Sequence, residues 1–374
     1  MDLSTIDLFL DDRHAELASG VMEFATHSIA TLPQPSDDYA ARLQAREILG
    51  LLGESGWSAY SVPAESESGL ALDSRACCLI REALAGASSL ADEVFALQCL
   101  GALPIALAGS DALQEKWLPA VAAGQAMGGF AMTEPEAGSD VGAITTRAIR
   151  EGDSYTLNGH KILISNAGIA DFYTVFAKSD PDSGSRGLTA FVVPADTKGL
   201  IFAGAQVMSQ PHPLGEQRYV DCRVPVESRL GVEGVGFKLG MGTLDRVRTT
   251  VAAAACGMAA RALEEALNHA RQRRQFGRPL AEFQLVQQKL AQMATELAAA
   301  RLLVYRAALE ADLGAKTVTL ESAMAKAYAT EAAQRIVDDA IQIIGGRGTL
   351  ADHPVDRLYR SVRALRIYEG ATDI

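Results

Sequence analysis

The spacing of apolar residues changes twice along the chain, and this change constrains the fold more than any other feature. Apolar residues recur at helical spacing up to about residue 125, short β-prone runs follow, and helical spacing returns after about residue 236. A β region between two helical regions predicts an α+β protein with domains at 1–125, 126–235 and 236–374. The 374 residues suffice for that number of domains.

The middle region contains four runs rich in strand-forming residues, at 154–157, 162–165, 172–176 and 188–193. Turn signals separate them, such as Asn158-Gly159 and the Asp-Ser-Gly at 182–184. No helical segment intervenes, which disfavours parallel βαβ units. The spacing predicts a small antiparallel β-barrel or sandwich.

The last region is marked by a long apolar stripe with alternating spacings of three and four residues. This pattern predicts one helix whose stripe packs against other helices, and a second Ala-rich run at 322–344 supplies a further helix. We expect a four-helix bundle in 236–374, with a stripe long enough to serve also as an oligomer contact. The stripe consists of Phe283, Val286, Leu290, Met293, Leu297, Ala300 and Val304.

Charge and cysteine usage narrow the function classes. The formal net charge of -12 and the pI near 5.1 oppose binding to nucleic acid or to an anionic membrane, although the basic run at 271–274 suits a single phosphorylated ligand. The five cysteines show no CxxC spacing, which favours reduced structural thiols. No basic n-region with an apolar core begins the chain and no run reaches the length of a membrane span, so we expect a cytoplasmic protein.

Two segments carry hydroxyl residues in irregular or strand settings. In TEPEAGSD at 133–140, Pro135 and Gly138 expose backbone N–H groups, while Thr133 and Ser139 add hydroxyl donors. This set suits a polar heterocycle or a phosphate, and a polar turn between domains is the simpler alternative. The second segment, GHKILISNA at 159–167, lies on a predicted strand.

Two further segments lie near predicted helix ends. An Arg in RRQFGRPL at 273–280 can make bidentate bonds to a pyrophosphate, although a double Arg is more often a solvated surface. The glycines of QIIGGRG at 342–348 follow a helix instead of a strand, which excludes a Rossmann dinucleotide loop and favours a glycine C-cap.

Together with Tyr368-Glu369-Gly370, these segments resemble the acyl-CoA dehydrogenase family in the expected order over nearly the whole chain. The resemblance implies an FAD-dependent oxidoreductase that converts an acyl thioester, on CoA or on an acyl carrier protein, into a trans-2-enoyl thioester. Glu369 would remove the α-proton, a hydride would pass to flavin N5, and an electron-transfer flavoprotein would accept the electrons. Val247 stands where some subfamilies carry the base, and valine cannot accept a proton.

The resemblance also implies a homo-oligomer, either a tetramer or a dimer, with no metal. Arg273, Phe276 and Gln284 would contact the FAD of a neighbouring subunit. The implied substrate contacts are Ser139, Asp245, Arg248 and Gly370. The implied cofactor contacts are Phe130, Met132, Thr133, Gly138, Ser139, Leu163, Ile164, Ser165, Arg273, Phe276, Gln284, Gln342, Gly346, Ala371 and Asp373.

Three positions depart from the family pattern. Leu163 replaces a common Trp, and it either covers the flavin by apolar contact or belongs to the strand core. Ala371 replaces a usual Thr, and the sequence stops at Ile374 without the usual short extension and its basic residue. The alternatives are therefore variant flavin chemistry, as in an oxidase, a desulfinase or a carrier-protein-linked dehydrogenase, or a non-catalytic helical scaffold.

Overall fold

The computed structural model describes residues 3–66, 69–315 and 317–374. They form two compact units that interleave along the chain. The helical unit draws on 1–32, 74–92 and 248–374, and the mixed unit on 33–73 and 93–247. The chain passes between them inside helices α4 (Ser89–Ala108) and α6 (Gly236–Gln272). The three predicted domain ranges stay a prediction.

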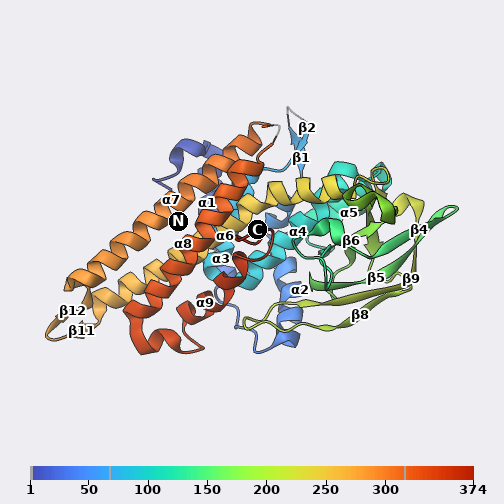
Figure 1. Ribbon diagram of the computed structural model, residues 1–374. Coiled ribbons are helices and arrows are strands. Elements are labelled where there is room, and N and C mark those ends of the chain that lie inside the picture. Colours follow the sequence, from blue (N-terminus) through green and yellow to red (C-terminus); the bar gives the residue numbers. More distant parts are fainter. Residues whose placement is uncertain (1–2, 67–68, 316) are drawn as a thin grey trace. The chain divides into compact units, whose positions relative to one another are not determined.

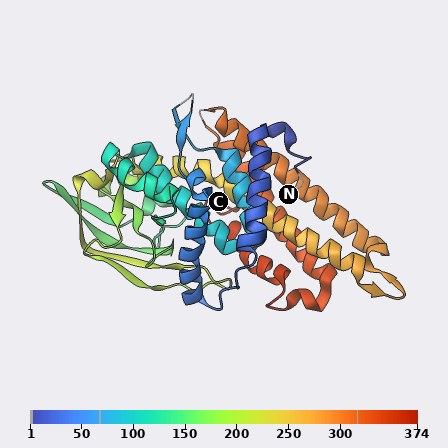
Figure 2. The same ribbon diagram turned by 180° about the vertical axis from the view of Figure 1, so that it is seen from behind.

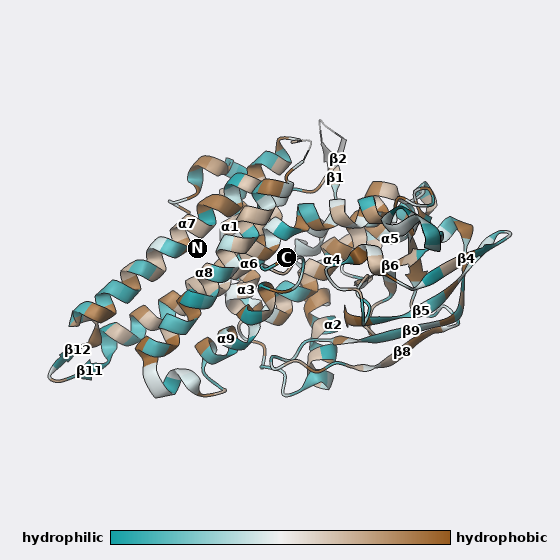
Figure 3. Ribbon diagram, in the orientation of Figure 1, coloured by the Kyte–Doolittle hydropathy of each residue, from teal (hydrophilic) through white to brown (hydrophobic). Residues whose placement is uncertain are grey.

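The helical unit is built from long Ala-rich helices. Helices α7 (Gln284–Asp312) and α8 (Thr319–Ile344) lie side by side along their length, as both ribbon views show (Figures 1 and 2). Their hydrophilic and hydrophobic residues alternate along the ribbon in Figure 3, as expected for helices with one buried face. The unit also contains α1 (Asp12–Phe24), α3 (Ser74–Ala87), α9 (Pro354–Leu365) and the hairpin strands β11 (Arg274–Gln275) and β12 (Arg278–Pro279).

The predicted stripe lies on α7 except for Phe283, which caps the start of the helix, and only its second half is core. Met293, Leu297, Ala300 and Val304 are buried, whereas the first three members are partly exposed. A buried carboxylate also joins α7 to α3: Glu82 accepts hydrogen bonds from Arg301 Nε at 2.7 Å and from the Tyr305 hydroxyl at 2.9 Å. The predicted long helix is therefore confirmed, and polar pairing supplements its apolar packing.

The mixed unit contains an eight-stranded sheet in the order β10-β7-β6-β4-β5-β9-β8, with β3 paired to β6. Strands β3 and β4 run parallel to β6, and the other neighbours are antiparallel. The strands are β3 (Gly128–Ala131), β4 (Arg147–Glu151), β5 (Ser154–Ser165), β6 (Phe172–Lys178), β7 (Leu188–Pro194), β8 (Leu200–Ala205), β9 (Leu214–Pro225) and β10 (Arg229–Leu230). The short pair β1 (Ala64–Ser66) and β2 (Gly69–Ala71) belongs to the same unit.

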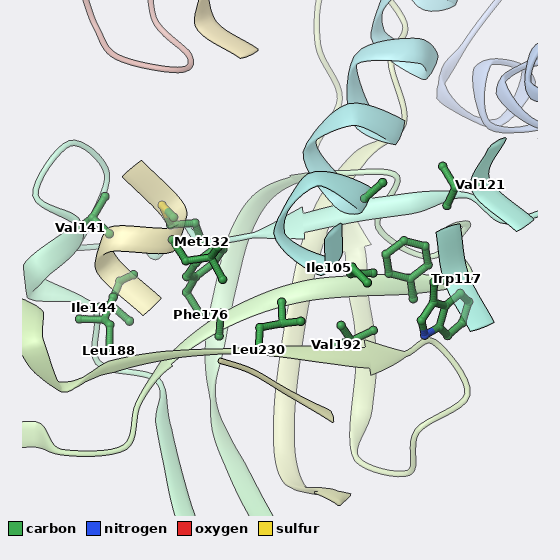
Figure 4. Packing of buried hydrophobic residues seen from close by; sticks show 14 of the residues in the cluster. Ile105, Trp117, Val121, Met132, Val141, Ile144, Phe176, Leu188, Val192 and Leu230 are labelled. Carbon is green, nitrogen blue, oxygen red and sulfur yellow. The ribbon is translucent and has the colours of Figure 1, made fainter. Parts of the chain in front are cut away.

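Helices α2 (Asp38–Glu54) and α5 (Asp111–Ala122) complete the mixed unit. Its apolar core joins α5 to the sheet, and Figure 4 shows Trp117 of α5 among the residues of this cluster. The ring centroids of Trp117 and Phe172 lie 4.5 Å apart. Ile105 of α4 and Val192 of β7 belong to the same cluster. Ser110 caps the start of α5, because its Oγ accepts from Leu113 N at 3.4 Å.

The turn predicted at Asn158-Gly159 is wrong, because both residues lie inside the continuous strand β5. A side chain at Gly159 would place its Cβ 2.2 Å from Thr146 Oγ1, so the glycine permits close packing instead of a turn. Asn158 Oδ1 accepts from the backbone N of Asp221 on β9 at 2.9 Å. The turn predicted at 182–184 does lie between β6 and β7.

The expectation that no segment reaches the length of a membrane span is wrong for helix α4. Among the described helices it alone is long and apolar enough, with 20 residues and a mean hydropathy of 1.5. However, 89% of its apolar window is buried inside the protein, as in the core helix of a globular protein.

Candidate active site

The loop after β3 is organised by a buried ion pair. Lys161 Nζ donates to Glu134 Oε1 at 2.8 Å and to the Met132 carbonyl at 2.9 Å, and both charged side chains are at most 3% exposed. Glu134 also accepts from the backbone N of Thr145 at 2.6 Å and of Thr146 at 3.0 Å. Burial alone raises the pKa of Glu134, but Lys161 and these donors lower it to about 2.

Strand β5 lies directly beside this loop. The backbone N of Ile162 donates to the Thr133 carbonyl at 3.0 Å, which brings the two predicted flavin segments together. Phe130 and Met132 precede the loop, and Met132 is buried, whereas Gly138 and Ser139 are exposed. The loop therefore presents hydroxyl and backbone groups at its surface, while its hydrogen bond to β5 holds it in place.

Leu163 stands at an irregularity in β5. Its φ of 54° is unusual for a residue with a side chain, and the pairing of β5 with β9 shifts register between Lys161 and Ile164. The side chain of Leu163 is 53% exposed and that of Ile164 only 1%. The strand-core alternative for Leu163 is therefore wrong, and its role as an apolar cover for the flavin stays a prediction.

Ser165 belongs to a polar chain that the sequence did not reveal. Its Oγ lies 2.8 Å from His212 Nε2, and the other ring nitrogen of His212 lies against Glu93 Oε2. His212 is 6% exposed. The three residues come from β5, from the loop before β9 and from α4, so no sequence spacing signals their association.

Glu369 lies in the helical unit with a strained backbone, at a φ of 53°. Arg248 Nε donates to the Glu369 carbonyl at 2.9 Å, and Lys326 Nζ donates to the carbonyl of Gly370. These cations bind the backbone and not the carboxylate. Among the described residues, no donor reaches the buried Oε2 atom of Glu369.

Burial and the nearby cations shift the pKa of Glu369 in opposite directions. Burial raises the pKa of the carboxyl group, and the nearby Arg81, Arg248 and Lys326 hold back the rise. Arg81 is itself buried and pairs with Asp92, with Arg81 Nε 2.7 Å from Asp92 Oδ1. The sequence reasoning missed this pair. Val247, which occupies the alternative base position, is 1% exposed.

Arg248 and Asp245 both lie on α6, but Asp245 belongs to the mixed unit and Arg248 to the helical unit. Both are half-buried. The hydrogen bond from Arg248 to the Glu369 backbone adds a positioning contact to the substrate-binding role expected for this arginine.

A cationic region gathers near the end of α6. Burial lowers the pKa of His269, and the neighbouring Arg347 and Arg273 lower it further, so these guanidinium groups lie within electrostatic range of one ring. Arg273 follows α6, and Arg347 follows α8 after the glycines. The expected C-cap is present, because Gly345 follows the last residue of α8 with a φ of 73°.

The predicted Phe276 lies at the tip of the β11–β12 hairpin. Phe276 and Gly277 have φ values of 51° and 82°, typical of a two-residue turn, and the Phe276 side chain is 93% exposed. Gln284, Gln342 and Gly346 are also exposed, as are Gly370 and Asp373, while Ala371 is half-buried. An open depression of about 400 Å³ bordered by α7, α8 and residues 359–366 contains none of the candidate residues.

Comparison with known proteins identifies the family. Models of the acyl-CoA dehydrogenase N-terminal, middle and C-terminal domains match residues 11–125, 129–222 and 234–374. A probable acyl-CoA dehydrogenase of Mycobacterium tuberculosis is 38% identical over 373 residues, which cover 99% of this chain and 95% of the relative. A 3-(aryl)acrylate reductase of Clostridium sporogenes is 38% identical over 370 residues, covering 98% and 97%.

The solved butyryl-CoA dehydrogenase of Megasphaera elsdenii has a TM-score of 0.89 at 34% identity, covering all of this chain and 97% of its own. The protein therefore belongs to the acyl-CoA dehydrogenase family, with helical, β and helical domains in that order. It is an oxidoreductase, so the alternative of a non-catalytic scaffold is wrong.

The cofactor of this family is FAD, and the expectation of FAD is confirmed. The residues present fit it in chemical terms. The mixed unit offers the exposed Ser139 hydroxyl and the exposed apolar Leu163, which suit a polar heterocycle with an aromatic face. The helical unit offers the guanidinium groups of Arg273 and Arg347, which suit a pyrophosphate.

Proposed function

We propose that the enzyme oxidises the Cα–Cβ bond of an acyl-CoA thioester to the trans-2-enoyl thioester, with Glu369 as the α-proton base. The supporting observation is the buried Oε2 atom of Glu369, which accepts no hydrogen bond from the described residues although its backbone is held by Arg248. A carboxylate kept away from donors retains its basicity. FAD, when bound, supplies the acceptor for the hydride that leaves the β-carbon.

The remaining candidate residues have binding roles in this proposal. The segments around Thr133 and Ser165 bind the flavin ring, Gln342 and Gly346 contact FAD, and Ser139, Asp245, Arg248 and Gly370 bind the thioester and its CoA. The proposal places the enzyme in the cytoplasm. In support, all five cysteines are free and buried, as in a reducing compartment.

We propose that the enzyme is a homo-oligomer in which the β11–β12 hairpin contacts the FAD of a neighbouring subunit through Arg273, Phe276 and Gln284. The support is the fully exposed Phe276 ring, held by a turn between two long helices. The ring makes an edge contact with Phe283, with centroids 6.4 Å apart, and the rest of its apolar surface is open to a neighbouring subunit. A monomer in sedimentation analysis of the FAD-loaded protein contradicts this part of the proposal.

Anaerobic mixing with straight, branched and aryl-substituted acyl-CoA thioesters tests the reaction. At least one thioester should bleach the yellow flavin of the wild type, and electron-transfer flavoprotein should restore the colour. Glu369→Gln should retain the yellow flavin and bleach about 100-fold to 10,000-fold more slowly, because an amide cannot accept the α-proton.

The matched control is Glu264→Gln, which alters an exposed carboxylate on α6 and should bleach at the wild-type rate. A normal rate in Glu369→Gln places the base elsewhere. No bleaching of the wild type by any acyl-CoA contradicts the proposed reaction itself.

A further inference from the structure

The chain Ser165–His212–Glu93 gives the Ser165 hydroxyl a defined direction. Glu93 Oε2 lies against His212 Nδ1, and a carboxylate can only accept a hydrogen bond. When the ring is neutral, its proton therefore lies on Nδ1 beside this carboxylate, and Nε2 presents a lone pair. Ser165 Oγ, 2.8 Å from Nε2, then donates its hydrogen to His212. Only oxygen lone pairs remain for a ligand.

The backbone around Ser165 is held independently of the imidazole. The backbone N of Asn166 donates to the Pro213 carbonyl at 2.6 Å, and Arg42 Nη2 donates to the Leu214 carbonyl at 2.7 Å. Arg42 also donates to the carbonyl of Ala167. These bonds join the end of β5 to the start of β9 without His212. The main effect of the imidazole is therefore on the direction of the hydroxyl.

We propose that His212 and Glu93 are positioning residues that make Ser165 a hydrogen-bond acceptor toward the flavin, so that the protein binds reduced FAD more tightly than oxidised FAD. This inference rests on the proposed function for the place of Ser165 beside the reactive edge of the flavin. N5 of oxidised flavin is an acceptor, whereas N5 of reduced flavin carries a hydrogen. An oxygen that only accepts pairs with the second and leaves the first without a partner.

The test compares dissociation constants for oxidised and reduced FAD, measured anaerobically by flavin fluorescence and by the reduction potential of the bound flavin. In His212→Ala the Ser165 hydroxyl can donate to oxidised N5. The preference for reduced FAD should fall about tenfold, or about 30 mV for a two-electron couple. A purely structural role weakens the binding of both forms alike and leaves their ratio unchanged.

Two controls isolate the path through Ser165. In a Ser165→Ala background, His212→Ala should no longer change the ratio, because the group that it directs is absent. His160→Ala removes a comparable pair, in which His160 Nε2 lies 2.8 Å from Glu216 Oε2, without touching Ser165. This variant should keep the wild-type ratio. Glu93→Gln is the second test variant if His212→Ala does not fold, and it should lower the same ratio.

The possible failures are distinguishable. FAD uptake and substrate bleaching with an unchanged ratio in His212→Ala and Glu93→Gln overturn this inference alone. An equal change of the ratio in His160→Ala also overturns it, since the effect is then not specific to Ser165. A wild type that takes up no FAD overturns the assignment of Ser165 to the flavin and, with it, this inference.

Discussion

Two glutamates on candidate segments have opposite surroundings, and of these Glu134 is buried whereas Glu369 is half-buried. In the mixed unit, Glu134 accepts from Lys161, Thr145 and Thr146, which together lower its pKa to about 2. In the helical unit, the cations near Glu369 donate to backbone carbonyls, and burial raises the pKa of the carboxyl group. One carboxylate is saturated with donors, whereas Oε2 of the other has none among the described residues.

This difference separates a structural charge from a group suited to proton transfer. A base must take up and release a proton near the working pH, and a carboxyl group with a pKa of about 2 stays ionised throughout that range. Glu134 can therefore fix the loop that follows β3 but cannot serve as the base. Glu369 has the opposite properties, and three variants test the contrast.

The largest effect is expected from Glu134→Ala. This change leaves the Lys161 ammonium, which is fully buried, without its carboxylate. Removing one partner of a buried ion pair costs about 3–5 kcal/mol of unfolding free energy. Urea denaturation of the FAD-free protein measures the loss.

The control for this variant is the double change Glu134→Leu with Lys161→Met. Replacing both charges by apolar residues of similar size should recover most of the lost stability. If Glu134→Ala loses less than about 1 kcal/mol, as is usual for a surface ion pair, Glu134 does not stabilise the fold as a buried, fully hydrogen-bonded charge.

An intermediate effect is expected from Gly159→Ala, which tests the strand that carries Lys161. The added Cβ would lie 2.2 Å from Oγ1 of Thr146, the residue whose backbone N donates to Glu134. Overpacking of this kind costs about 1–3 kcal/mol. Gly50→Ala on α2 is the control, since nothing lies within 4 Å of its added Cβ, and it should be neutral or slightly stabilising. Equal stabilities of the two variants exclude tight packing at Gly159.

The sequence predicted the parts of the fold that depend on periodicity. The helices of 284–312 and 319–344 and most of the antiparallel sheet follow from the spacing of apolar residues. The turn predicted at Asn158-Gly159 was wrong because an Asn-Gly pair favours a turn by its local conformation. In the structure the same glycine lies inside a strand, where the absence of a side chain lets Thr146 pack closely.

The candidate site was predicted less completely, for a physical reason. Family motifs marked Glu369 and Ser165, which lie in recognisable short segments. The Arg81 charge near Glu369 and the His212 ring beside Ser165 come from segments far away in sequence, and only the structure brings them to these residues. Side-chain pairing between distant segments leaves no periodic signal, so the groups that set charge and direction required the structure.

The smallest effect is expected from Lys326→Met, which acts on Glu369 through charge. Burial raises the pKa of Glu369, and the Lys326 ammonium holds back that rise, so its removal raises the pKa further. The ionised base forms only above this pKa. Substrate bleaching should therefore slow roughly threefold to tenfold on the acid side of the pH profile.

The pH dependence distinguishes this charge effect from a change of shape. Burial lowers the pKa of Lys326 to about 8, so at higher pH the wild type also loses the ammonium and Glu369 is ionised in both proteins. The two rates should then converge. Lys289→Met, which breaks the pair with Asp339, should match the wild type at every pH. If the bleaching rate of Lys326→Met is lower by the same factor at all pH values, Lys326 only holds the Gly370 carbonyl. The Lys326 charge then does not act on the pKa of Glu369.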